Sequence, residues 1–291
     1  MSKEFTAVGV MKLAEKGLLS LDDPISKHLQ GLPESWRGVT LRQALTHTSG
    51  LPDILTDDLN LYLIAPTWEE ALPKLAELPA QKAGQASSYN QTGYILVGQV
   101  IERVTGLSFE AFIQRELFDP LGLKAAVYGD SWDIIKGRSE LYTAVAASVD
   151  GTKLVAVNGR PQLSTDGIRR YGSKVFPRFT HPTGGLNMNL EDLVRWELAL
   201  AAGQVISKKS LAEMSTPQVL DDGKPGAFGL SFLIGQLAGN KTVSSGGGAA
   251  VWCLRIPEKR ITVLVLSNLQ GSFPERLAAR IAEEYLTTEK R

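Results

Sequence analysis

Ser2-Lys3-Glu4-Phe5-Thr6-Ala7, at the start of the chain, is the stretch from which the fold can be inferred. From it onward, apolar side chains recur every three residues: Phe5, Val8 and Met11. This spacing predicts an amphipathic helix over residues 2–16, which Gly17 would end. No capping residue precedes this helix, although the first N–H groups of a helix need partners outside it. We therefore expect that a segment upstream of Met1 is missing from the sequence.

Two later segments also carry side chains suited to catalysis. Tyr89-Asn90-Gln91 comes directly before a predicted helix over residues 92–104. Ser244-Ser245-Gly246-Gly247-Gly248 comes before two apolar, β-branched runs, residues 251–256 and 261–267, which predict a hairpin. Taken alone, a tyrosine in a loop is usually a packing residue and a glycine-rich run is a flexible turn. No P-loop lysine pattern accompanies the glycines, so they do not indicate phosphate binding.

Together, the three segments resemble the motifs of the serine β-lactamase-like superfamily, which includes class C β-lactamases, penicillin-binding proteins and family VIII esterases. Its first motif is Ser-x-x-Lys at a helix N-terminus, where the lysine amine shares a helix face with the serine and can take its proton. Lys3 matches the lysine, Ser2 the residue before it and Met1 the variable position. The nucleophilic serine would directly precede Met1 and is absent from this chain. Ser2 is a poor substitute, because adjacent helical residues point about 100° apart.

The resemblance implies roles for the second segment. Tyr89 matches the tyrosine of the family's Tyr-x-Asn motif and would be a second acid/base. Gln91 stands where asparagine is usual, and it would bind the carbonyl side of the substrate and the lysine. His47 lies in another stretch that resembles the family, residues 41–53. We interpret it as structural, because lysine and tyrosine do the proton transfer in these enzymes.

The third segment corresponds to the family's Lys/His-x-Gly motif, on the strand that lines the cleft and completes the oxyanion hole. Either Ser244 or Ser245 stands where lysine or histidine is usual, and Gly246 and Gly247 follow. Glycine suits this position because the substrate would lie against the backbone. A serine in place of the cation would weaken the binding of a substrate carboxylate.

The fold that the resemblance implies is α+β. It consists of an antiparallel sheet flanked by helices, with a mainly helical inserted region and with its N-terminal strands upstream of this chain. We expect a single catalytic module over residues 1–291. Within it, residues 20–185 would form the mainly helical region, and residues 1–19 with 186–291 the sheet-containing region. Residues 154–157 predict a strand followed by an Asn158-Gly159 hairpin turn.

The composition argues against several classes of function. Lys and Arg total 31, as do Asp and Glu, so no net charge favours nucleic acid. Cys253 is the only cysteine, which excludes an internal disulfide and favours a buried structural thiol. No apolar stretch approaches the roughly 18–20 residues that span a bilayer. His28 and His181 lack ligand-like neighbours, so we expect neither a metal site nor a cofactor.

The sequence therefore predicts a serine hydrolase that forms an acyl-enzyme with a small-molecule or peptide substrate bearing an ester, amide or β-lactam. The chain as printed would be inactive. The alternative is a catalytically silent binding or scaffold protein that keeps the cleft. Without the upstream strands, residues 261–267 would form an exposed sheet edge prone to self-association. The compartment is left open: cytoplasmic as written, periplasmic or secreted if an export signal lies upstream.

Overall fold

The computed structural model describes residues 1–55, 65, 67–129, 133–143, 156–157, 160–161, 169–170, 177–248 and 250–288. Its contacts divide the chain into two compact units. The sheet unit comprises Met1, Ser131–Lys174 and Gly235–Arg291, and the helical unit comprises Ser2–Asp130 and Val175–Ile234. These boundaries differ from the two regions expected from the sequence, because residues 2–19 and 186–234 belong to the helical unit. A single catalytic module stays a prediction.

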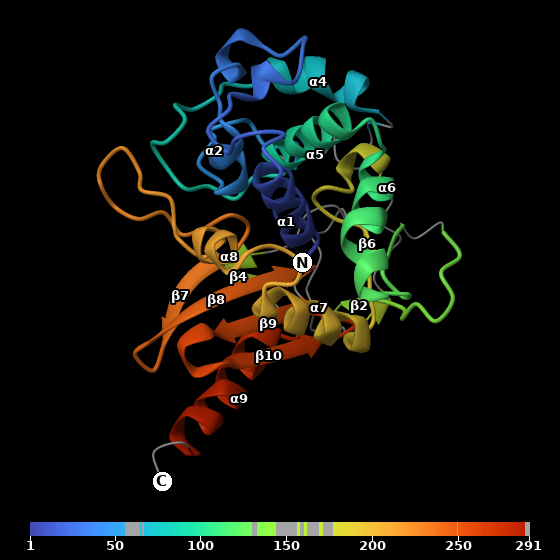
Figure 1. Ribbon diagram of the computed structural model, residues 1–291, viewed down its shortest axis with the longest axis vertical. Coiled ribbons are helices and arrows are strands. Elements are labelled where there is room, and N and C mark those ends of the chain that lie inside the picture. Colours follow the sequence, from blue (N-terminus) through green and yellow to red (C-terminus); the bar gives the residue numbers. More distant parts are fainter. Residues whose placement is uncertain are drawn as a thin grey trace. The chain divides into compact units, whose positions relative to one another are not determined.

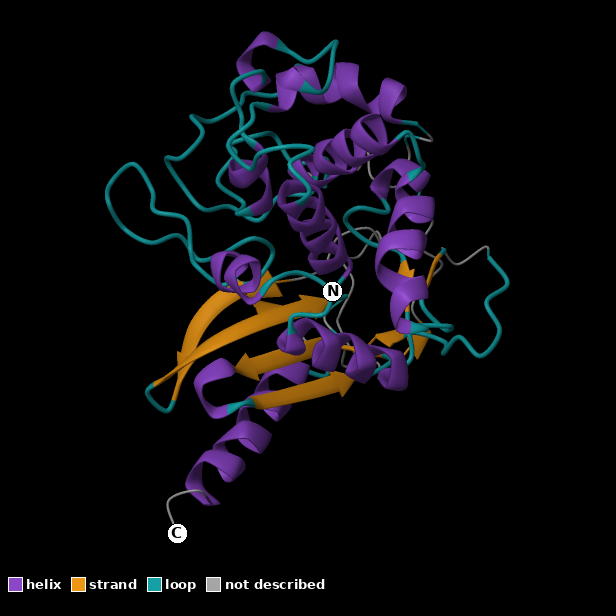
Figure 2. Ribbon diagram, in the orientation of Figure 1, coloured by secondary structure: helices purple, strands orange, loops and turns teal. Residues whose placement is uncertain are grey.

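The sheet unit is built on a four-stranded sheet with the strand order β10–β9–β8–β7 (Figure 1, Figure 2). Its strands are β7 (Leu233–Leu237), β8 (Asn240–Gly247), β9 (Val251–Ile256) and β10 (Ile261–Leu266). β9 pairs antiparallel with both β8 and β10. The predicted hairpin is present, and its turn is a short 3-10 helix, Pro257–Lys259. An antiparallel sheet accompanied by helices confirms the predicted fold class.

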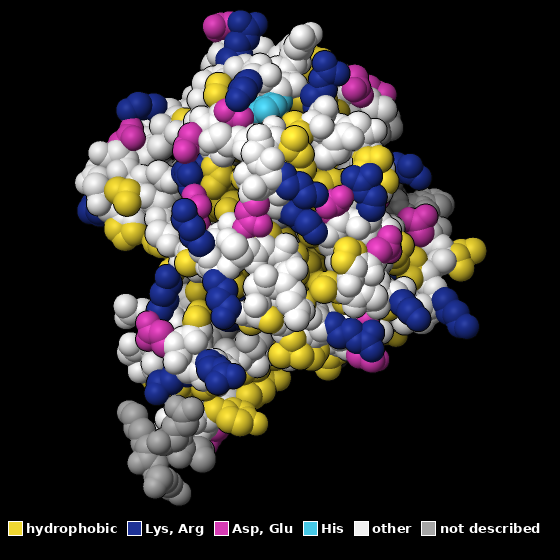
Figure 3. Space-filling model, in the orientation of Figure 1, with side chains coloured by type: hydrophobic (Ala, Val, Ile, Leu, Met, Phe, Trp, Pro, Cys, Tyr) yellow, Lys and Arg dark blue, Asp and Glu magenta, His cyan; other side chains and the backbone are white. Residues whose placement is uncertain are grey.

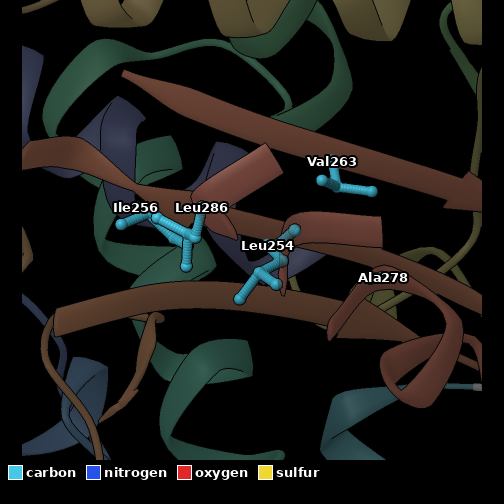
Figure 4. Close-up of a cluster of buried hydrophobic side chains, with 6 residues drawn as sticks. Leu254, Ile256, Val263, Ala278 and Leu286 are labelled. Atoms are coloured by element: carbon cyan, nitrogen blue, oxygen red, sulfur yellow. The ribbon is translucent and has the colours of Figure 1, made fainter. Parts of the chain in front are cut away.

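One face of this sheet is covered by helix α9 (Pro274–Thr288). The hydrophobic cluster between them, which Figure 4 shows, contains three strand residues and three helix residues: Leu254, Ile256, Val263, Ala278, Ala282 and Leu286. Directly paired residues point to the same face of a sheet. Ser244 is paired with Leu254 and belongs to the face under α9, whereas Ser245 is paired with Cys253 and belongs to the opposite face.

β10 forms one edge of the sheet among the residues that the structure describes, because it pairs with β9 alone. Shorter strands complete the unit. β11 (Leu269–Gln270), β2 (Tyr142–Thr143) and β5 (Arg169–Arg170) form a three-stranded ladder. β3 (Ala156–Val157) pairs antiparallel with β4 (Arg160–Pro161), as the predicted hairpin requires. Residues 154–155 and 158–159 lie outside the described part of the chain.

The helical unit holds α1 (Ser2–Glu15), α2 (Leu41–Leu45), α4 (Trp68–Ala76), α5 (Thr92–Thr105), α6 (Phe109–Ile113), α7 (Leu190–Ala202) and α8 (Lys208–Met214). Most of these helices begin after a residue whose side chain accepts a hydrogen bond from the first turn: Thr40, Thr67, Ser108, Asn189 and Ser207. α5 lacks such a bond from its own preceding residue, Gln91, and ends at Gly106 with φ 71°. β1 (Val127–Tyr128) and β6 (Leu186–Asn187) pair beside these helices.

Helix α1 corrects the sequence prediction in one respect. It spans nearly the predicted range, but it is not amphipathic, since its residues from Lys3 to Met11 are all buried. α1 packs along α5 and α6, and Figure 1 shows α1 and α5 side by side. On another side, the Phe5 ring lies 4.3 Å from the Trp196 ring of α7, and the Trp196 indole N–H donates to Glu4 Oε1 at 2.8 Å. A helix enclosed in this way shows no polar stripe.

The charged surface agrees with the neutral composition. On the face drawn in Figure 3, Lys and Arg side chains are interspersed with Asp and Glu. No helix within the described residues has both the length and the apolar character needed to cross a membrane.

Candidate active site

Lys3, Tyr89 and Gln91 lie together in the helical unit. Lys3 is in the first turn of α1, and its Nζ donates to Gln91 Oε1 and, at 3.2 Å, to the carbonyl oxygen of Thr183. The same Nζ lies 4.7 Å from the centre of the Tyr89 ring and 5.4 Å from that of Tyr94. Lys3 is buried, whereas the Tyr89 side chain is half exposed. A buried amine beside an accessible phenol is an arrangement suited to proton transfer. Their roles stay a prediction.

The electrostatics of Lys3 reflect opposing influences. Burial lowers the pKa of Lys3, and the neighbouring Tyr89 and Asp53 oppose that shift. A lowered pKa increases the fraction of free amine near neutral pH, which a general base requires. The two carbonyl-type acceptors and two aromatic faces around Nζ also suit an ammonium group. Burial therefore favours the free amine of Lys3, whereas the surrounding acceptors and aromatic rings favour its ammonium form.

The segment before α5 is fixed by three hydrogen bonds to residues 51–54. The Asn90 side-chain amide donates to the Leu51 carbonyl at 2.8 Å. The Ile54 N–H donates to Thr92 Oγ1 at 3.0 Å, and the Gln91 N–H donates to Asp53 Oδ1 at 3.1 Å. Asn90 Oδ1 accepts from the Gly93 N–H in the first turn of α5 at 2.8 Å, and Asp53 binds the N–H of Gln91 just before the helix. The sequence analysis placed residues 41–53 within the family resemblance but did not single out Asp53.

His47 supports the same segment from the other side. Its backbone has φ 59°, in the left-handed region that is strained for most residues, and its carbonyl accepts from the Ser88 N–H at 2.8 Å. Its Nδ1 accepts from the Asn90 N–H at 3.1 Å, and its ring lies 4.5 Å from the Tyr89 ring. Burial, helped by the charge of Lys3, lowers the pKa of His47 to about 3, so the imidazole is neutral. The structural role of His47 stays a prediction.

The loop that presents the Thr183 carbonyl to Lys3 is held against α1 and α5. Thr6 Oγ1 donates to the Pro182 carbonyl at 2.7 Å. On α5, a Cβ at Gly98 would lie 2.1 Å from Pro182 Cγ, so only glycine permits this approach. Neither contact was anticipated from the sequence, because both depend on how distant segments pack.

The third motif lies in the sheet unit, next to Met1. The Met1 nitrogen donates to the Gly246 carbonyl, and Ser245 Oγ donates to Met1 Sδ at 3.3 Å. Arg255 Nη1 reaches Ser245 Oγ at 3.4 Å from the neighbouring strand. Ser245 therefore faces Met1, whereas Ser244 points to the face under α9. This favours Ser245 over Ser244 as the residue at the cation position. That β8 completes the site of Lys3 and Tyr89 stays a prediction.

The fold is of the β-lactamase/transpeptidase-like type. The family model described as Beta-lactamase matches residues 1–286, and the chain belongs to that family.

Several known proteins are similar to this chain in sequence or in structure. Penicillin-binding protein 4* of Bacillus subtilis (strain 168) is 27% identical over 315 residues, which cover 98% of this chain and 63% of that protein. The chain thus spans less than two thirds of the length of this relative. The octameric penicillin-binding protein homologue from Pyrococcus abyssi matches with a TM-score of 0.76 and 26% identity, over 98% of this chain and 64% of that one. D-amino acid amidase from Ochrobactrum anthropi SV3 shares the fold, with a TM-score of 0.75 and 21% identity over 100% and 84% of the two chains.

Proposed function

We propose that this protein is a serine hydrolase that acts through an acyl-enzyme on an ester, an amide or a β-lactam. The observation that carries the proposal is the contact of the buried Lys3 amine with both Gln91 and the ring of Tyr89. Membership of the Beta-lactamase family supports it. In the printed sequence, the position three residues before Lys3 lies just before Met1.

The proposed reaction uses a serine at that position. Lys3 accepts the hydroxyl proton while the serine oxygen attacks the substrate carbonyl carbon, and Tyr89 serves as the second acid/base when the leaving group departs. Water then hydrolyses the acyl ester. The bond from the Met1 nitrogen to the Gly246 carbonyl supports a serine beside the end of β8, because the preceding residue is attached to that nitrogen. Backbone N–H groups of residues 244–248 would supply the strand side of the oxyanion hole.

A second candidate function is a binding or scaffold protein with the same cleft and no chemistry. A genuine start of the protein at Met1 would favour this second function. Reading the gene in frame upstream of Met1 separates the two candidates. A serine codon directly before Met1 supports the hydrolase, and any other codon supports the silent protein.

We expect the hydrolase to prefer small esters over penicillins. Ser245 stands where a lysine or histidine would bind the carboxylate of a penicillin, and one lost charge-assisted hydrogen bond costs about 1.5–3 kcal/mol, or roughly one to two factors of ten in affinity. The measurement compares kcat/KM for p-nitrophenyl butyrate and nitrocefin on a chain extended by serine. Ser245→Lys should shift the ratio toward nitrocefin. A preference for nitrocefin in the unmutated site would indicate that Arg255 supplies the missing cation.

We also expect the chain to self-associate through the edge strand β10. This strand is apolar, β-branched and free of proline and charge, a composition that recruits other chains. Size-exclusion chromatography with light scattering should show a mass that rises with protein concentration. The Pyrococcus abyssi homologue is octameric, which makes an assembly of this chain worth measuring.

A matched pair of variants tests the edge. Leu264→Lys puts a charge on β10 and should restore the monomer. Leu277→Lys puts the same charge on α9, where Leu277 is 52% exposed, and should leave the association unchanged. A monomer at high concentration, or equal effects of the two variants, would show that the edge is not the contact.

A further inference from the structure

Asp53 is the one carboxylate that the described contacts tie to the Lys3 environment, and the proposed reaction leaves it without a role. It lies in the segment between α2 and α5 and is partly buried. Its Oδ1 accepts hydrogen bonds from the Gln91 N–H at 3.1 Å and the Leu55 N–H at 3.2 Å. The side chain of Gln91 in turn accepts from Lys3 Nζ. Asp53 is thus one residue removed from the amine.

The position of Gln91 depends on this carboxylate. Gln91 precedes the first residue of α5, and its side chain makes no capping bond there. The acceptor for its N–H comes from Asp53, so the carboxylate fixes the backbone that carries the amide to Lys3. The Gln91 carbonyl accepts from the Ile95 N–H at 3.1 Å within α5, and the Gln91 N–H is bound by Asp53.

The charge of Asp53 acts on Lys3 directly as well. Tyr89, Tyr94 and His47 are titratable groups beside the amine, and Glu4, next to Lys3 on α1, accepts from the Trp196 indole N–H. Burial raises the pKa of Tyr94 well above its ordinary value, and His47 is neutral above about pH 3, so neither changes charge near neutrality. The effect of burial on the pKa of Lys3 is opposed first by Tyr89 and then by the charge of Asp53.

We propose that Asp53 is a positioning residue of the candidate site, which holds Gln91 against Lys3 through the backbone and stabilises the ammonium form of Lys3 through its charge. Its charge therefore contributes, after burial and Tyr89, to the pH at which Lys3 becomes a free amine. The catalytic consequence, the pH at which acylation begins, rests on the proposed function. The two effects on Gln91 and Lys3 do not, and they are measurable without turnover.

Two substitutions separate the effects. Asp53→Asn keeps an oxygen for the Gln91 N–H and removes the charge, whereas Asp53→Ala removes both. The Lys3 side-chain signal is followed by NMR in chain labelled with ¹³C- and ¹⁵N-lysine, assigned with Lys3→Arg and titrated over about pH 6–11. Hydrogen exchange of the Gln91 backbone amide gives the second measurement. Asp221→Asn is the matched control, because Asp221 pairs with Lys82 on the surface at 2.5 Å.

We expect the Lys3 midpoint to move to lower pH in both Asp53 variants and to stay in place in Asp221→Asn. Exchange at Gln91 should accelerate in Asp53→Ala and remain slow in Asp53→Asn. A Lys3 midpoint that is the same in Asp53→Asn and Asp221→Asn would overturn the charge effect, and slow Gln91 exchange in Asp53→Ala would overturn the positioning effect. Failure of a serine-extended chain to acylate would disprove the hydrolase and leave these results intact. Far-UV circular dichroism verifies that each variant is folded.

Discussion

A chain with a serine directly before Met1 is expected to form a stoichiometric acyl adduct with a fluorescent penicillin or a fluorophosphonate, and the chain as printed to form none. The reason is the spacing of the first motif, in which serine and lysine three residues apart share a helix face. Replacing Lys3 by Met in the extended chain removes the base and should slow acylation by about 10²–10⁴-fold. Intact-protein mass spectrometry measures both results.

Two controls make this result specific. Lys12→Met changes a lysine of the same helix that bonds to the Glu116 carbonyl, and acylation should continue at the unmutated rate. Ser2→Ala in the extended chain should likewise acylate normally. An adduct on Ser2 of the printed chain would overturn the alignment of the first motif, since it would make Ser2 the nucleophile.

The local features of the fold could be predicted from sequence because each depends on neighbouring residues. The hairpin of β9 and β10 follows from two β-branched runs separated by a short polar turn. Helix α5 follows from apolar periodicity and the glycine at Gly106. Lys3, Tyr89 and Gln91 were selected by their resemblance to family motifs, and the structure brings these three side chains together.

The remaining features depend on packing between segments far apart in the chain. α1 is buried on all sides because α5, α6 and α7 surround it. The three-residue spacing of its apolar side chains predicts only one buried face. Asp53 looks like an ordinary loop carboxylate until the start of α5 lies against it. The choice of Ser245 over Ser244 needed the strand register, because a shift of one residue moves a side chain to the other face.

The burial of α1 leads to the largest expected change in stability. Trp196 is fully buried against Phe5, and its indole N–H donates to Glu4, the residue next to Lys3. Trp196→Ala should lower the free energy of unfolding by about 3–5 kcal/mol, because it opens a cavity beside α1. Trp196→Phe keeps much of the ring and loses the hydrogen bond to a carboxylate, at a cost of about 1.5–3 kcal/mol.

Urea unfolding measures these differences as shifts of the midpoint at a constant slope. Leu198→Ala is the control, because Leu198 lies on the same helix and is 67% exposed, so its truncation should change the free energy of unfolding by no more than about 0.5 kcal/mol. Equal losses for Trp196→Ala and Leu198→Ala would mean that α7 does not hold α1 in place. We expect the free energy of unfolding to be lowest for Trp196→Ala, intermediate for Trp196→Phe and highest for the unmutated chain. This order would show that the helix bearing Lys3 depends on the packing and hydrogen bonding of one tryptophan.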